Sequence, residues 1–373
     1  MKNKARKLKS AIEKADDLRV KARYRESLAA LTRALKACGP REFGELYSCH
    51  LLAGHNWRML GDFGKAIAHY EKAIASAGKM EKNPQEQEMS RNADASVSMA
   101  LAYRALGDWK KALQLLKEAE RTYRRLKDDE ALAFVLWSKG GTFRIKGDIG
   151  RAIGSLTEAR KMFAALGDEH AVGYCLNGLG GASRIKGAYK ASLGYYTKAN
   201  TLFRRLKDPF GLAYSFCGTG NAMRMMERHE EALGQFRRAL KTYKKIGDIV
   251  SSSYTLWSVS KSLLFTGKME KAEKTLKEAE KFFAKTKDPR GGIYCLLSEA
   301  ELEAMKGRAK KAAVLASRAL DDSKKHGFAI ELCHARALLG SLGARDGGKA
   351  DMGCYKKLGL KKPDFRKAPV NLP

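Results

Sequence analysis

The sequence predicts an all-α solenoid of about eight helix pairs followed by a C-terminal capping helix. Three consecutive 40-residue blocks share one template, 166–205, 206–245 and 246–285. Each block holds two helical apolar patterns separated by a short polar break, and a fixed period of this kind is typical of repeat arrays. The 7 prolines avoid the strongly periodic segments, as expected for a chain built from helices.

The second helix of each predicted pair carries a small residue, a large apolar residue four positions on, and a small residue three further. This spacing puts all three on one helix face, where small side chains let neighbouring helices approach closely. The eighth copy is degenerate, with Ala316 at the large position. The copies are separated by 39, then 46, then five times 40 residues. They begin at Ser27, Ala66, Ala112, Ala152, Ser192, Ala232, Ala272 and Ala312.

Turn residues mark the same frame. Glycine can take the left-handed position that ends a helix, and aspartate can cap the next helix through its side-chain oxygen. Within repeats the pairs are Gly61-Asp62, Gly107-Asp108 and Gly147-Asp148, and between repeats the predicted caps are Asp128, Asp168, Asp208, Asp248 and Asp288.

These marks predict the organisation of the chain. Repeats one and two occupy 1–79, a polar linker or helix extension 80–91, and repeats three to eight 92–325. Capping helices are expected over 326–360, because terminal repeats need a polar outer face. Residues 361–373 hold three prolines and no periodicity, which predicts a basic disordered tail.

The net charge of +31 favours polyanionic partners, although Lys-rich solvated helix faces explain it equally well. The seven cysteines are an odd number without CxxC spacing, which indicates a reducing compartment and no disulfide scaffold. We therefore expect a cytoplasmic protein. The first 14 residues lack the apolar core of a signal peptide, and no run of about 18 apolar residues predicts a membrane span.

The helix pairs resemble tetratricopeptide repeats, and the resemblance covers most of the chain. That family has a large–large–small–aromatic pattern in its first helix and a small–aromatic–small pattern in its second. One repeat matches at Leu176, Leu179, Gly180, Ser192, Tyr196 and Ala199, and another at Leu136, Gly140, Phe143, Ala152, Leu156 and Ala159, with Lys139 as a departure. The 40-residue period resembles the longer repeats of kinesin light chains, MalT-type regulators and peptide-responsive quorum-sensing proteins. The resemblance implies a right-handed superhelix whose first helices line a concave groove for an extended peptide or a partner helix.

An arginine recurs at one position near the end of successive first helices. The ladder consists of Arg58, Arg104, Arg144, Arg184 and Arg224 and is broken at Leu264. Arginine offers a planar fork of donors suited to carboxylate or phosphate. Neighbouring helices lie roughly 8–10 Å apart, or about three residues of extended chain, so a ligand with an acidic residue at every third position would fit. The alternative is structural: each arginine is stabilised by the dipole at the C-terminal end of its helix, or it forms an ion pair with an acidic residue of the adjacent repeat.

Other first-helix positions complete the predicted peptide-binding groove. They are Tyr174, Tyr214, Tyr254 and Tyr294 in one column, Trp137, Asn177 and Trp257 in a second, and Asn221 in a third. The tyrosines have an alternative role in packing between repeats.

The sequence predicts neither catalytic residues nor a cofactor, because the histidines and cysteines lack zinc spacing and no nucleophile–base set stands out. We expect a non-enzymatic interaction scaffold that binds an acidic or extended peptide segment of a partner protein. Two alternatives stay open: a nucleic-acid binder that uses the basic surface, and a module that senses a peptide or metabolite.

Overall fold

The computed structural model describes residues 2–21, 23–80, 85–343, 353–365 and 368–372. In these ranges all regular secondary structure is helical, which confirms the predicted all-α class. The chain divides into two compact units, Met1–Ser138 and Lys139–Pro373. The division falls within a helix, whereas the sequence placed a linker at 80–91.

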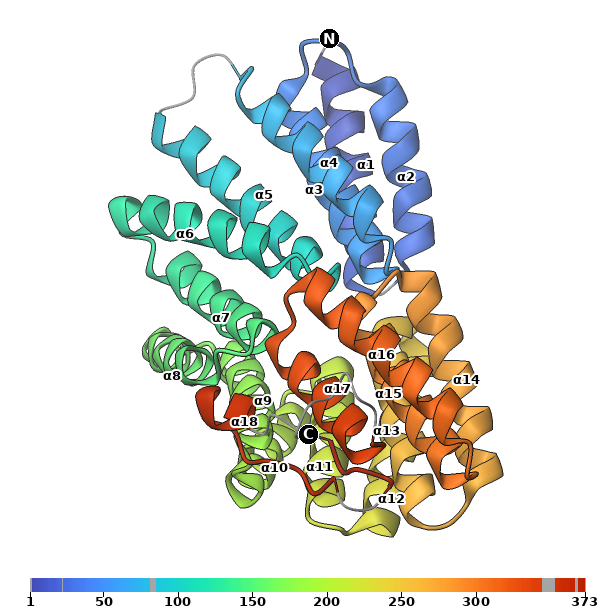
Figure 1. The fold of residues 1–373 in the computed structure, drawn as a ribbon. Coiled ribbons are helices and arrows are strands. Elements are labelled where there is room, and N and C mark those ends of the chain that lie inside the picture. The colour runs from blue at the N-terminus through green and yellow to red at the C-terminus, as the bar shows by residue number, and fades with distance from the viewer. Residues whose placement is uncertain (1, 22, 81–84, 344–352, 366–367, 373) are drawn as a thin grey trace. The chain divides into compact units, whose positions relative to one another are not determined.

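The first unit contains three helix pairs and the start of a fourth (Figure 1). Its helices are α1 (Lys2–Val20), α2 (Tyr24–Ala37), α3 (Phe43–Met59), α4 (Phe63–Ala77), α5 (Gln85–Ala105), α6 (Trp109–Leu126) and the first part of α7 (Asp129–Lys146). Helix α5 begins at Gln85, so the described part of the predicted linker from that residue on is a helix extension. Residues 81–84 lie outside the described ranges.

The second unit continues the alternation of first and second helices. It holds the rest of α7, then α8 (Ile149–Ala165), α9 (Glu169–Lys186), α10 (Tyr189–Arg205), α11 (Pro209–Met225), α12 (His229–Ile246), α13 (Ile249–Phe265), α14 (Met269–Thr286), α15 (Pro289–Met305), α16 (Ala309–His326), α17 (Ala329–Ser341) and α18 (Gly353–Lys357). Helices α17 and α18 lie in the segment predicted to cap the array. No described helix is long and apolar enough to cross a membrane.

The predicted small–large–small triads form the contacts within the helix pairs. All eight triads are buried, from Ser27, Leu31 and Ala34 in α2 to Ala312, Ala316 and Ala319 in α16. Where the first helix comes closest it carries glycine: a Cβ built on Gly180 would lie 2.8 Å from the ring of Tyr196. The periodic small residues therefore fix how closely the two helices of a pair approach.

The predicted helix caps are confirmed at all eight aspartates. Each side chain accepts a hydrogen bond from a backbone N–H in the first turn of its helix, as Asp168 does from Ala171 at 2.9 Å. The other caps are Asp62, Asp108, Asp128, Asp148, Asp208, Asp248 and Asp288. The preceding residue is left-handed in each turn, and it is glycine except at Lys127, Lys207 and Lys287.

The second unit curls until its last first-type helix meets its beginning. A Cβ built on Gly147, in the turn between α7 and α8, would lie 3.2 Å from Ile330 of α17. Helix α18 then packs on α17, where the buried His334 Nδ1 and the Tyr355 hydroxyl are 2.6 Å apart. A disulfide between Cys333 and Cys354 joins the same two helices, which the cysteine pattern did not predict.

The segment predicted to be a disordered tail is packed against the first helices of its unit in the described residues 361–365 and 368–372, here called the tail (Figure 1). The Lys361 N–H donates to the Lys186 carbonyl at 3.4 Å. Phe365, Val370 and Leu372 are buried. The prediction and the structure differ because the tail's few apolar side chains are buried against the rest of the unit.

Candidate functional site

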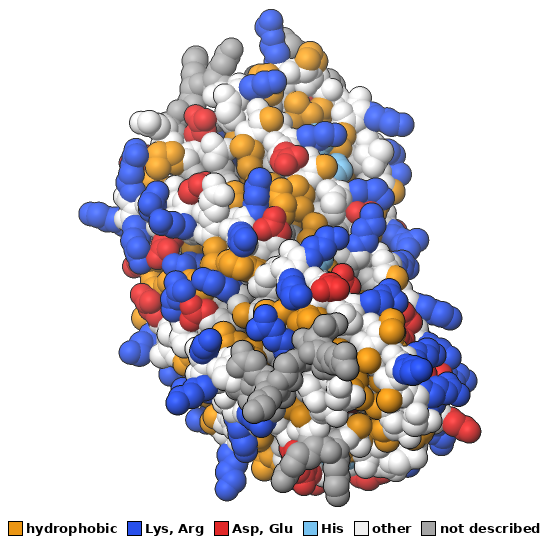
Figure 2. All heavy atoms as spheres, viewed as in Figure 1, with side chains coloured by type: hydrophobic (Ala, Val, Ile, Leu, Met, Phe, Trp, Pro, Cys, Tyr) orange, Lys and Arg blue, Asp and Glu red, His pale blue; other side chains and the backbone are white. Residues whose placement is uncertain are grey.

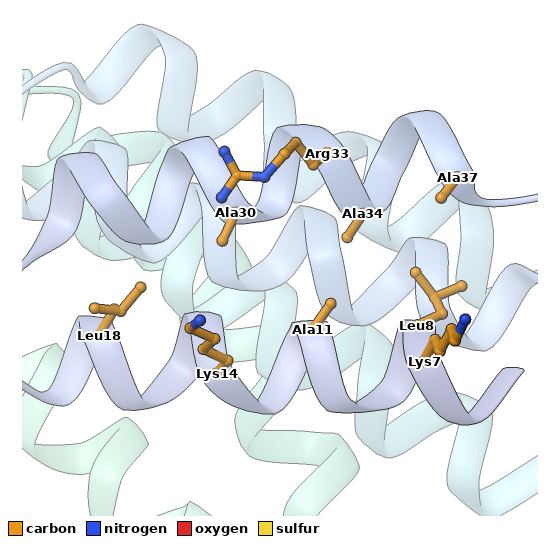
Figure 3. Close-up of a pocket in the computed structure, with 9 residues that line it drawn as sticks. All are labelled: Lys7, Leu8, Ala11, Lys14, Leu18, Ala30, Arg33, Ala34 and Ala37. Atoms are coloured by element: carbon orange, nitrogen blue, oxygen red, sulfur yellow. The ribbon is translucent and has the colours of Figure 1, made fainter. Parts of the chain in front are cut away.

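Each unit has a sizeable groove on its surface. In the first unit, a groove of about 680 Å³ lies between α1 and α2. Figure 3 shows its floor of alanines and leucines, such as Ala11 and Ala34, with Lys7, Lys14 and Arg33 along the rim. The floor offers apolar contact and the rim offers only positive charge.

The groove of the second unit lies between α10 and α12 and has a volume of about 650 Å³. Four arginines line it: Arg204, Arg205, Arg228 and Arg238. Arg205 and Arg228 form ion pairs with Glu169 and Glu231 at 2.6 Å each, so half of the arginine charge is neutralised internally.

The arginine ladder lies on first helices, and its last member is enclosed. Arg224 in α11 is fully buried. Its Nη1 donates to Asn371 Oδ1 at 2.6 Å and its Nη2 to the Leu372 carbonyl at 2.9 Å, while Asn371 Nδ2 donates back to the Arg224 carbonyl at 2.8 Å. The guanidinium also lies 5.4 Å from the centre of the Trp257 ring. The arginine therefore binds a peptide carbonyl and a side-chain amide.

Electrostatics at Arg224 follow from this burial. Loss of hydration, and next the like charge of Arg184, lower the pKa of Arg224 to about 9, which leaves it charged at neutral pH. A buried charge is stable only with hydrogen-bond acceptors around it. Asn371, Leu372 and Asn221 supply those acceptors.

Two earlier members of the ladder lack acidic partners. Among the described residues, neither Arg144 nor Arg184 forms an ion pair with Asp or Glu, and Arg184 Nε is buried without a hydrogen bond. The guanidinium of Arg144 reaches across to α9, because a Cβ built on Gly181 would lie 2.6 Å from Arg144 Nη1. The glycine makes room for this arginine. Bridging to an adjacent repeat's acid therefore does not explain these two positions.

An asparagine on the same face of α9 is also unsatisfied. Asn177 is 2% exposed, and both its Nδ2 and its Oδ1 lack a hydrogen-bond partner among the described residues. Asn177, Gly181 and Arg184 follow i, i+4, i+7 spacing and share one helix face. A buried, unpaired amide costs roughly 1–3 kcal/mol, so Asn177 has unused capacity to donate and accept hydrogen bonds.

A buried ion pair extends the site over α13 and α15. Lys261 and Glu301 are in contact, and both are fully buried. Burial lowers the pKa of Lys261 and raises the pKa of Glu301, and their mutual attraction opposes both shifts. Glu301 Oε2 also accepts the N–H of Val370 at 3.2 Å.

The first two ladder members belong to the other unit. Arg58 is half-buried near the end of α3, and its charge acts on the buried Tyr70. Arg104 of α5 lies 5.8 Å from the centre of the Trp137 ring. Both share the repeat position of Arg144, Arg184 and Arg224, but they belong to the first unit.

The tyrosine column braces successive repeats. The Tyr174 hydroxyl donates to Asp208 Oδ2 at 2.6 Å and the Tyr254 hydroxyl to Asp288 Oδ2 at 2.7 Å. Each bond ties a first helix to the cap of the next, which agrees with the alternative of packing between repeats.

The other two tyrosines of the column are engaged within the protein as well. Tyr294 is buried and accepts from Arg290 Nη2 at 3.1 Å, and half-buried Tyr214 lies 6.4 Å from the ring of Phe210. The column therefore contributes to the site mainly by fixing the spacing of the first helices.

Trp257 and Asn221 lie beneath the tail. The Trp257 indole donates to Ser298 Oγ at 2.9 Å. Asn221 Oδ1 accepts from Ser258 Oγ at 2.9 Å and from Arg224 Nη2 at 3.3 Å. These bonds hold the guanidinium of Arg224 between an amide and an aromatic face. The structure thus gathers Arg144, Asn177, Arg184, Asn221, Arg224 and Trp257 on first helices of the second unit, here called the groove face.

Sequence reasoning missed Lys261, Glu301 and the three tail residues. The signal for the pair was present, because Lys261 and Glu301 are oppositely charged residues 40 positions apart, at the same position of successive repeats. Nothing local marks Val370, Asn371 or Leu372.

Helix pairs of one period, with first helices lining an inner face, define a helical repeat protein. Residues 92–165 match the family described as tetratricopeptide repeat. The match is confined to this segment, and the same helix-pair arrangement continues through the other described repeats.

Solved structures share this fold along most of the chain. A Rap protein complexed with competence and sporulation factor is similar over 95% of this chain and 98% of its own, with a TM-score of 0.61 and 13% identity. The Rap conjugation gene regulator of plasmid pLS20 in complex with the Phr* peptide covers 86% and 96%, with a TM-score of 0.64 and 14% identity. NprR in complex with its cognate peptide NprX covers 80% and 86%, at 0.58 and 14%. No curated protein matches the chain.

Proposed function

We propose that the protein is a non-enzymatic interaction scaffold whose groove face binds a peptide segment of a partner through carboxylate, amide or carbonyl oxygens. The observation that carries the proposal is Arg224, which is buried and binds the Asn371 side chain and the Leu372 carbonyl. The same groove position one and two repeats earlier holds Arg184 and Arg144 without acidic partners.

The fold supports a peptide as the ligand class. Three solved structures of similar fold contain a bound factor or peptide. The unsatisfied amide of Asn177 adds a donor and an acceptor between the arginines, which suits a peptide backbone better than an isolated anion. A charge-assisted hydrogen bond contributes about 1.5–3 kcal/mol. Arg144 and Arg184, which form no ion pair among the described residues, therefore favour an acidic segment.

The test uses the full chain and an array of synthetic ten-residue peptides with zero to three Asp residues. In one set the Asp residues stand at every third position, and in the other the same residues are scrambled. We expect the spaced set to bind more tightly, and the variant Arg144→Ala/Arg184→Ala to lose at least about tenfold in affinity, which corresponds to about 1.4 kcal/mol.

The matched control is Arg204→Ala/Arg205→Ala, which removes the same charge from α10. It should bind the spaced peptides like the wild type. Equal losses in both double variants, or no preference for the spaced set, would sink the proposal. Arg224 is left unchanged, because its replacement removes a buried hydrogen-bond network.

Nucleic acid is the second candidate, and the groove between α10 and α12 favours it locally. There Arg238 lies 5.6 Å from the centre of the Phe216 ring, which combines positive charge with an aromatic face. Figure 2 shows Lys and Arg side chains spread over the visible face with Asp and Glu among them, without one continuous basic track. Binding of single-stranded RNA that weakens steeply with salt and is lost in Arg204→Ala/Arg238→Ala would support this role.

A further inference from the structure

The tail reaches the groove face through a series of anchors. Phe365 lies 6.2 Å from Tyr355, centre to centre, and Lys361 Nζ lies 5.3 Å from the centre of the Tyr189 ring. These contacts bring the chain from α18 past α9 and α10 (Figure 1). Asn371 and Leu372 then contact Arg224 of α11, and Val370 contacts Glu301 of α15.

These three residues contact the groove as a ligand would. The Leu372 N–H donates to the Val370 carbonyl at 3.0 Å, so the segment forms a tight turn with Asn371 at its tip. Asn371 exchanges two hydrogen bonds with Arg224. Val370 and Leu372 are each 1% exposed, so one polar side chain is flanked by two buried apolar ones.

The polar groups beneath the turn are arranged for a main chain. Glu301 Oε2 accepts the Val370 N–H and Arg224 Nη2 donates to the Leu372 carbonyl. Both are buried charged side chains that face one donor and one acceptor of the tail. The site therefore recognises one backbone N–H, one backbone carbonyl and the side-chain amide of Asn371.

We propose that residues 368–372 occupy the groove face as an intramolecular ligand, and that a partner peptide with an Asn between two apolar residues displaces them. The inference rests on the proposed function, because it assigns the partner's chemistry and the regulation of the same groove face. A tethered segment competes at an effective concentration near the millimolar range, so a free peptide binds the wild-type chain only weakly.

Docking of the tail is tested first, without any peptide. The amide exchange of Val370 is measured in the full chain, in Asn371→Ala and in Lys362→Ala, an exposed tail position that serves as control. We expect slow exchange in the wild type and in Lys362→Ala, and at least tenfold faster exchange in Asn371→Ala. Exchange at the rate of an unstructured chain in the wild type overturns the proposal.

Competition is tested with a fluorescein-labelled synthetic peptide that copies residues 361–373. We expect it to bind the Asn371→Ala chain at least tenfold more tightly than the wild type. The variant tail docks more weakly, so a larger fraction of the molecules has a free groove face. Lys362→Ala should behave like the wild type.

Equal affinity for wild type and Asn371→Ala, or binding to neither, overturns the proposal. The spaced-Asp array separates this failure from failure of the proposed function. If the array peptides still bind in an Arg144- and Arg184-dependent manner, the groove is a peptide site and only the role of the tail is refuted.

Discussion

Replacing Glu301 by Gln should destabilise the second unit strongly. The change removes the only acidic partner that the described residues provide for buried Lys261. Breaking a buried ion pair from one side costs about 3–5 kcal/mol. A second estimate limits the loss of stability in the variant, because Lys261 can lose its proton instead of staying buried and charged. Deprotonation costs about 1.4 kcal/mol for each pH unit below the ordinary pKa of lysine. Between pH 7 and the ordinary lysine pKa of 10.5 this amounts to about 5 kcal/mol.

The difference in the free energy of unfolding between wild type and Glu301→Gln should depend on pH. In Glu301→Gln, burial keeps the pKa of Lys261 below its ordinary value without an opposing attraction. Between that lowered pKa and 10.5 the unfolded chain binds more protons than the folded chain, so the free energy of unfolding rises with pH. The gap between wild type and variant should therefore narrow from pH 7 to pH 9.

The assay is urea unfolding followed by circular dichroism at both pH values, compared at equal slope. Glu303→Gln is the matched control on α15, because Glu303 pairs with Arg308 and Lys311, whose side chains are 60% exposed. Such surface pairs contribute about 0–1 kcal/mol. A loss of less than about 1 kcal/mol in Glu301→Gln, or a gap that widens with pH, would refute the reasoning.

Two further predictions concern the repeat frame and use the same unfolding assay. Gly218→Ala should destabilise the protein by about 1–3 kcal/mol, because the added Cβ would overlap the buried ring of Tyr196, whereas Gly194→Ala meets nothing within 4 Å and should be neutral or stabilising by up to about 1 kcal/mol. Lys207→Gly should stabilise by up to about 1–2 kcal/mol, because Lys207 is left-handed with a φ of 55° where the preceding repeat has Gly167; an unchanged or lower midpoint would contradict this account.

The frame of the fold was predictable because local sequence determines it. Helix caps such as Asp168 depend on a few neighbouring residues, and triads such as Ser192, Tyr196 and Ala199 depend on helical periodicity. Both recur at a fixed period, so each copy supports the others. The tyrosine braces follow the same logic, since Asp208 stands 34 residues after Tyr174 and Asp288 stands 34 residues after Tyr254.

The candidate site was predictable only in part. The ladder position of Arg224 followed from periodicity, but its burial depends on a segment 147 residues away. Two apolar residues flanking an asparagine after a proline carry no pattern that predicts docking. The tail folds onto the groove because Arg224 and Glu301 present a donor and an acceptor there, which is a property of the assembled unit.

Displacement of the tail from the groove face is tested most directly by following Val370 in the full chain while a peptide binds. The chain is labelled with ¹⁵N-valine, the unlabelled copy of residues 361–373 is added to saturation, and amide exchange at Val370 is measured by NMR. Displacement of the tail predicts slow exchange without peptide and at least tenfold faster exchange with it, because the peptide takes the tail's place on Arg224 and Glu301. Exchange that stays slow while the peptide is bound would contradict it.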